Sequence, residues 1–65
     1  MNPYSVTVRR RGVPELEMRL LVQESSKLAA GELATAIAER RHGGMFEARR
    51  VRRALVHDEA VFDAA

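Results

Sequence analysis

The sequence predicts a small α+β domain with the order strand, strand, helix, strand, in which one helix packs on one face of a three-stranded sheet. Two early segments alternate apolar and polar residues, as strands with one buried face do. A third segment repeats apolar residues every three or four positions, which is the spacing of one helix face. Glycine and proline separate the two early segments and favour a turn between them.

The first two strands are expected at residues 4–10 and 16–23, joined by a turn in "RRGVP". Val6 and Val8 lie on one side of the first strand, and polar residues lie on the other. The second strand alternates in the same way except at Leu21, an apolar residue on the polar side. Its apolar side comprises Leu16, Met18, Leu20 and Val22.

The helix is expected at residues 26–42. Ser25 or Ser26 is placed to cap its first amides, and Gly43 follows a basic last turn, where glycine commonly ends a helix. Gly31 costs about 1 kcal/mol relative to alanine inside a helix, so the helix begins later than Ser26 or uses the bare Cα for close packing. The apolar stripe comprises Ala30, Leu33, Ala34, Ile37 and Ala38.

Residues 46–56 fit two interpretations. As a helix, Ala48, Val51 and Leu55 share one stripe, and the composition favours that state. As a strand, the segment places Arg49 and Arg53 on the apolar side, where they have to lie at its edges or be turned out by a bulge. We predict the strand, because a lone hairpin is a poor platform for a helix and a third strand completes the sheet.

The connection through the helix is expected to be right-handed, which places the last strand beside the first strand or at the far side of the second. In both arrangements Leu33 and Ile37 of the helix contact the apolar side of the first hairpin, at Val6, Val8, Met18 and Leu20. Residues 57–65 form an acidic tail, in which a short terminal helix capped by Asp58 is possible.

A chain of 65 residues is expected to form one domain, residues 1–65, with a thin core. It has no cysteine for a disulfide or a thiolate metal site, and Leu21 is expected to be exposed, so we expect a homodimer or a tighter partner-bound state that extends the core. No apolar run approaches the roughly 20 residues of a membrane helix, and the N-terminus lacks the features of a signal peptide. A cytoplasmic protein with no membrane partner is the expectation.

Charge is distributed unevenly along the chain. Residues 1–56 hold all eleven basic side chains against six acidic ones, a balance of +5, although the whole chain carries only +2. The three remaining acids are Asp58, Glu59 and Asp63 of the tail. Arginine outnumbers lysine ten to one, a bias that GC-rich codon usage also produces. The basic body and acidic tail indicate a protein that binds an anionic partner.

Little in the sequence suggests catalysis. It contains neither a nucleophile motif nor a glycine-rich phosphate loop, so we expect no enzyme, no cofactor and no small-molecule substrate. His42 is expected to contact the last carbonyls of the helix. His57, Asp58 and Glu59 are adjacent and do not converge on one metal ion, so we expect solvated side chains and no metal site.

The candidate binding site lies on the sheet face that the helix leaves uncovered. Guanidinium groups match phosphate and carboxylate equally well, so this face suits a nucleic acid or an acidic protein. The alternative is a solvated face whose arginines pair with Glu15, Glu17 and Glu47. The predicted site comprises Arg9, Arg11, Arg19, Leu21, Arg50 and Arg52.

Duplex nucleic acid is slightly favoured as the ligand. A basic body releases counterions from the phosphate backbone, and a β-ribbon can enter a major groove. Only Tyr4, Phe46 and Phe62 are aromatic, too few to stack the bases of a single strand. The alternative is a protein-protein interaction or oligomerisation module, an accessory inhibitor or regulator that binds an acidic protein surface, because Leu21 among arginines resembles an interface core.

Overall fold

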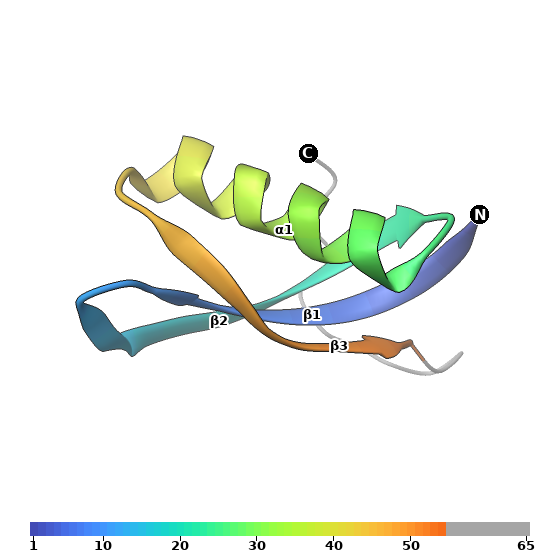
Figure 1. Cartoon of the computed structure of the whole chain (residues 1–65), viewed down its shortest axis with the longest axis horizontal. Coiled ribbons are helices and arrows are strands. Elements are labelled where there is room, and N and C mark those ends of the chain that lie inside the picture. Colours follow the sequence, from blue (N-terminus) through green and yellow to red (C-terminus); the bar gives the residue numbers. More distant parts are fainter. Residues whose placement is uncertain (55–65) are drawn as a thin grey trace.

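The computed structural model describes residues 1–54 and confirms the predicted α+β fold, with one helix above a three-stranded sheet (Figure 1). The elements are β1 (Asn2–Arg10), β2 (Val13–Glu24), α1 (Lys27–His42) and β3 (Phe46–Arg53). Both strands of the first hairpin are slightly longer than predicted. The possible terminal helix and the last two residues of the predicted strand 46–56 lie outside the described residues.

The sheet is antiparallel with the order β2-β1-β3, so β3 lies beside β1 and not beyond β2. Val6 marks the centre of the sheet, because it pairs with Leu20 of β2 on one side and with Val51 of β3 on the other. The central position of β1 explains why Val6 and Val8 are the most deeply buried side chains of the sheet. It also leaves β2 and β3 as the two edges.

The hairpin between β1 and β2 turns at Arg11 and Gly12. Gly12 has a φ of 81°, a left-handed conformation that glycine adopts without steric cost. Arg10 pairs with Val13 and Arg9 pairs with Glu17, so the register shifts directly after the turn. From Arg9 back to the start of β1, the pairing with β2 is regular.

Both ends of α1 are capped. The Ser26 Oγ accepts a hydrogen bond from the Ala29 N–H at 3.2 Å. Of the two serines that the sequence offered as N-cap, Ser26 is therefore the one used. Gly43 has a positive φ of 73°, and its N–H donates to the Glu39 carbonyl at 2.8 Å. The helix therefore begins and ends within one residue of the predicted limits.

The core lies between α1 and the sheet. Ile37 of α1 is 2% exposed, and Val6 and Val8 of β1 are completely buried. Leu33, predicted to pack on the sheet beside Ile37, is only partly buried. Like Met18, it packs against the core without belonging to its buried residues. The buried apolar residues are Tyr4, Val6, Val8, Leu20, Val22, Ala30, Ala34, Ile37, Ala38 and Phe46. Several of them are alanines, so the helix lies close to the sheet and the core is thin.

A β-bulge in β3 reconciles its sequence with a strand. Thr7 pairs with Arg50 and Val8 pairs with Ala48, which leaves Arg49 as the extra residue. The bulge returns Val51 to the helix side, opposite Val6, and moves Arg50 to the opposite side. Without the bulge, strict alternation from Ala48 would have placed Arg50 on the helix side, beside α1. The bulge accommodates Arg49, whereas Arg53 lies opposite Tyr4 at the end of the strand, where it is exposed.

Candidate binding surface on the open sheet face

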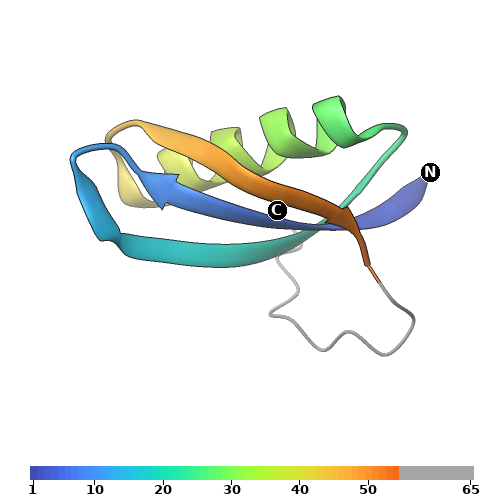
Figure 2. The same cartoon turned by 60° about the horizontal axis from the view of Figure 1, so that its bottom comes forward.

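The open face is the side of the sheet that points away from α1, and Figure 2 shows the sheet turned toward the viewer. Cross-strand pairing arranges its side chains in rows, because residues directly opposite one another point to the same face. The three central rows, each read from β2 through β1 to β3, are Glu17, Arg9 and Glu47; Arg19, Thr7 and Arg50; and Leu21, Ser5 and Arg52.

The charged side chains of the first row are all engaged in ion pairs or salt-bridged hydrogen bonds, or lie opposite such a pair. The Arg9 Nε and Nη2 both lie 3.2 Å from the Glu17 Oε2. On the other side, the Glu47 carboxylate lies 3.6 Å from the Arg11 Nε and 3.4 Å from the Arg49 Nη1. Two carboxylates thus engage three guanidinium groups at this end of the face. These pairs are solvent-exposed, so they add little stability, but they lower the local positive potential.

The second row is not balanced. Arg19 and Arg50 lie on either side of Thr7, on β2 and β3 respectively. Neither guanidinium makes a hydrogen bond or an ion pair with another residue of the described part of the chain, 1–54. Their backbones are two strand spacings apart, roughly 10 Å. The second row therefore presents two cations that have no counterion among residues 1–54.

The third row is mixed in character. Leu21 is half-buried and is therefore less exposed than the sequence suggested. Ser5, between Leu21 and Arg52, is only 2% exposed. The Arg52 Nη1 donates to the backbone carbonyl of Arg53 at 3.4 Å. This row therefore adds an apolar margin and one more guanidinium to the cationic pair.

Five of the six residues predicted for the site lie on the open face. The sixth, Arg11, lies in the hairpin turn, where its backbone N–H donates to the Met45 carbonyl at 2.8 Å and its side chain pairs with Glu47. Sequence reasoning did not separate the paired Arg9 from the unpaired Arg19, because the difference depends on which strand carries an acid directly opposite. It also left out Arg49, whose position depends on the bulge.

Residues 1–54 contain neither a cluster of metal-ligating side chains nor a membrane-spanning helix. No three histidine or acidic side chains there are grouped so as to hold a metal ion, and no helix there is long and apolar enough to cross a bilayer. His42 contacts the ring of Phe46, with centroids 6.1 Å apart and planes tilted by 47°. Its observed contact is thus with the first residue of β3.

Comparison with known proteins adds no functional information, since no protein-family model, no curated protein and no solved structure matches the chain. The open face therefore has to be interpreted from its own chemistry.

Proposed function

We propose that the chain is a non-enzymatic binding protein whose open face binds duplex nucleic acid. The observation that carries the proposal is the pair Arg19 and Arg50, which lie on either side of Thr7, on β2 and β3, and have no counterion among residues 1–54. A phosphate backbone supplies the anions that this pair lacks among residues 1–54, and guanidinium groups bind phosphate oxygens in a bidentate fashion. Arg52, one row away, extends the cationic area along β3.

The position of the aromatic residues supports duplex over single-stranded nucleic acid. Tyr4 and Phe46, the aromatic residues of the described part, are 7% and 4% exposed and belong to the core on the helix side. They are therefore not available for base stacking, on which the binding of single strands relies. A face of arginines without aromatic rings suits contacts to the backbone of a duplex.

The class of ligand is tested by comparing a random duplex with one of its single strands across a salt series. We expect the duplex to bind more tightly and the logarithm of its affinity to fall with log salt with a slope of about −2 to −3, if Arg19, Arg50 and Arg52 each meet one phosphate. Absence of duplex binding at low salt would rule the proposal out.

An acidic protein surface is the second candidate, and Leu21 favours it. A half-buried leucine next to arginines resembles the mixed apolar and cationic composition of protein interfaces. Leu21→Ala distinguishes the two ligands, because it removes apolar contact and no charge. A protein partner is expected to bind the variant more weakly, whereas backbone binding to a duplex is expected to remain unchanged.

A further inference from the structure

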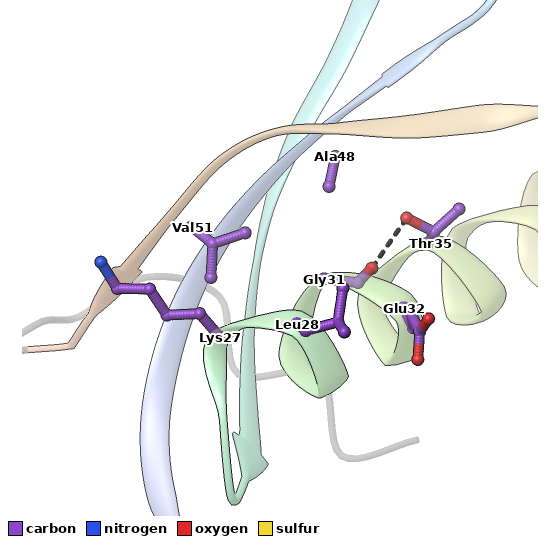
Figure 3. A pocket seen from close by; sticks show the side chains of 7 residues that line it. All are labelled: Lys27, Leu28, Gly31, Glu32, Thr35, Ala48 and Val51. Atoms are coloured by element: carbon purple, nitrogen blue, oxygen red, sulfur yellow. Dashed lines mark hydrogen bonds between the residues drawn. The ribbon is translucent and has the colours of Figure 1, made fainter.

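An apolar groove lies between α1 and β3, on the helix side of the sheet and apart from the open face (Figure 3). It has a volume of about 490 Å³ and is lined by Lys27, Leu28, Gly31, Glu32, Thr35, Ala48 and Val51. Because β3 is an edge strand, the groove is bordered by an unpaired strand edge. A neighbouring molecule can therefore approach it from the side without displacing any of residues 1–54.

Gly31, which has no side chain, lines the groove and leaves a hollow there. A Cβ built on Gly31 would lie 3.5 Å from the Val51 Cγ2 and 3.6 Å from the Ala48 Cβ, which is ordinary contact. Close packing within the monomer thus does not require glycine here. The Thr35 hydroxyl donates to the Gly31 carbonyl at 2.8 Å, so it needs no outside partner (Figure 3).

Leu28 supplies a matching projection. It is 74% exposed, although leucine is among the residues most often buried, and it lies on α1 only three positions before Gly31. Projection and hollow therefore occur on the same flank of one helix. A surface that carries both is complementary to itself when a second copy approaches with its helix antiparallel, as in a two-fold interface.

We propose that the groove is the interface between two copies of this chain, with Leu28 of each copy seated on Gly31 of the partner subunit. The charges of the residues next to Leu28 and Gly31 support this pairing. An antiparallel alignment that places Leu28 against the partner's Gly31 also places Lys27 against the partner's Glu32, because one residue back along one helix corresponds to one residue forward along its antiparallel partner. The first turn of α1 has no acidic residue of its own, so the partner's Glu32 also approaches a helix N-terminus that favours negative charge.

The geometry of this dimer has a consequence that rests on the proposed function. With the helices side by side and antiparallel, the two-fold axis runs perpendicular to the sheets, so both open faces point in the same direction. The dimer then presents two copies of the pair Arg19 and Arg50 to one ligand. The self-association itself is tested without nucleic acid, so failure of either proposal is visible separately.

The first test is sedimentation equilibrium of the full chain over a concentration series, with Leu28→Ala and a matched control, Met45→Ala. Leu28 and Met45 are both exposed large apolar residues, but Met45 lies outside the groove. We expect a wild-type dimer and a dissociation constant raised about 25-fold by Leu28→Ala, about fivefold at each of two equivalent sites. Met45→Ala is expected to leave it unchanged. Wild-type chain that remains monomeric at millimolar concentration, or equal weakening by both variants, would overturn the proposal and leave the groove to a different partner.

Gly31→Ala separates association from folding. The added methyl group fits within the monomer and improves helix propensity, so the monomer is expected to unfold at a higher urea concentration. The same methyl group fills the hollow that receives Leu28 of the partner subunit, so the dimer is expected to dissociate more readily. A variant that is more stable and dimerises as tightly as the wild type would contradict the assigned contact.

A charge exchange tests the register. Lys27→Glu and Glu32→Lys are each expected to weaken the homodimer, because each places like charges opposite one another. An equimolar mixture of the two variants is expected to form a heterodimer as tight as the wild-type dimer, since both cross-subunit pairs are then opposite in sign. A mixture no tighter than either variant alone would exclude the antiparallel register.

Discussion

The Glu39 carboxylate accepts a hydrogen bond from the backbone N–H of Phe46 at 3.0 Å. This contact joins the last turn of α1 to the first residue of β3, across Gly43 and Gly44, which both have positive φ. It is partly buried, so the Phe46 N–H has restricted access to water when the carboxylate is removed. The link holds the start of β3 against the last turn of α1.

We expect Glu39→Ala to lower the free energy of unfolding by about 2 kcal/mol, the range for losing a hydrogen bond to a charged group. Urea denaturation followed by circular dichroism measures the loss. Arg40→Ala is the matched control, because Arg40 is an exposed neighbour on the same helix. Equal stability of the two variants would show that the link does not stabilise the fold.

The N-cap of α1 gives a second prediction. Ser26→Ala is expected to cost about 1 kcal/mol, because the Ala29 N–H loses its acceptor at the start of the helix. Ser25→Ala serves as the control, since Ser25 precedes the cap and its oxygen does not bond the helix amides in this structure. Thermal unfolding of both variants decides the point. A larger loss of stability for Ser25→Ala than for Ser26→Ala would show that Ser25, and not Ser26, caps the helix.

The turn between β1 and β2 gives a third prediction. Nothing lies within 4 Å of a Cβ built on Gly12, so substitution there costs only backbone strain at a φ of 81°. Gly12→Ala is expected to destabilise the fold by about 1 to 2 kcal/mol. Gly12→Asn is expected to cost less, because asparagine tolerates the left-handed region. Urea midpoints test this order, and an alanine variant as stable as the wild type would contradict the assigned turn.

The acidic tail is predicted to oppose binding of a polyanion. Exchanging Asp58→Asn, Glu59→Gln and Asp63→Asn raises the formal net charge from +2 to +5. We expect tighter binding of a random duplex at low salt and convergence with the wild type at high salt, where long-range charge effects are screened. Fluorescence anisotropy with a labelled duplex provides the measurement. Unchanged affinity at low salt would contradict the electrostatic account.

Much of the fold follows from local patterns in the sequence. Alternation around Val6 and Val8 and the three-four spacing around Ile37 were sufficient for the first hairpin and the helix, because one buried face dominates each element. The last strand was harder, since local propensity favours a helix there and only the tertiary need for a third strand outweighs it. Its position beside β1 was not predictable from the sequence, because the crossover rule allows both edges.

The candidate surfaces were predictable only in part. The sequence separated Arg19 and Arg50 from the core correctly, but the ion pairing of Arg9 follows from cross-strand register with Glu17, which alternation alone does not provide. One feature of the sequence could have indicated the exposed Leu28: it is an apolar residue that lies outside the apolar stripe of α1. Its relation to the hollow at Gly31 depends on the distance between α1 and β3, which only the folded structure gives.

The most direct test of the proposed binding face compares two double variants that remove the same charge. Arg19→Ala with Arg50→Ala removes the unpaired guanidinium groups, whereas Arg9→Ala with Arg11→Ala removes two that pair with Glu17 and Glu47. Binding of a random duplex is measured across a salt series for both and for the wild type. The account predicts that the slope of log affinity against log salt becomes shallower by about 2 for the first variant and stays at the wild-type value for the second. Equal slopes for the two variants would show that only net charge matters and would contradict a binding site centred on Arg19 and Arg50.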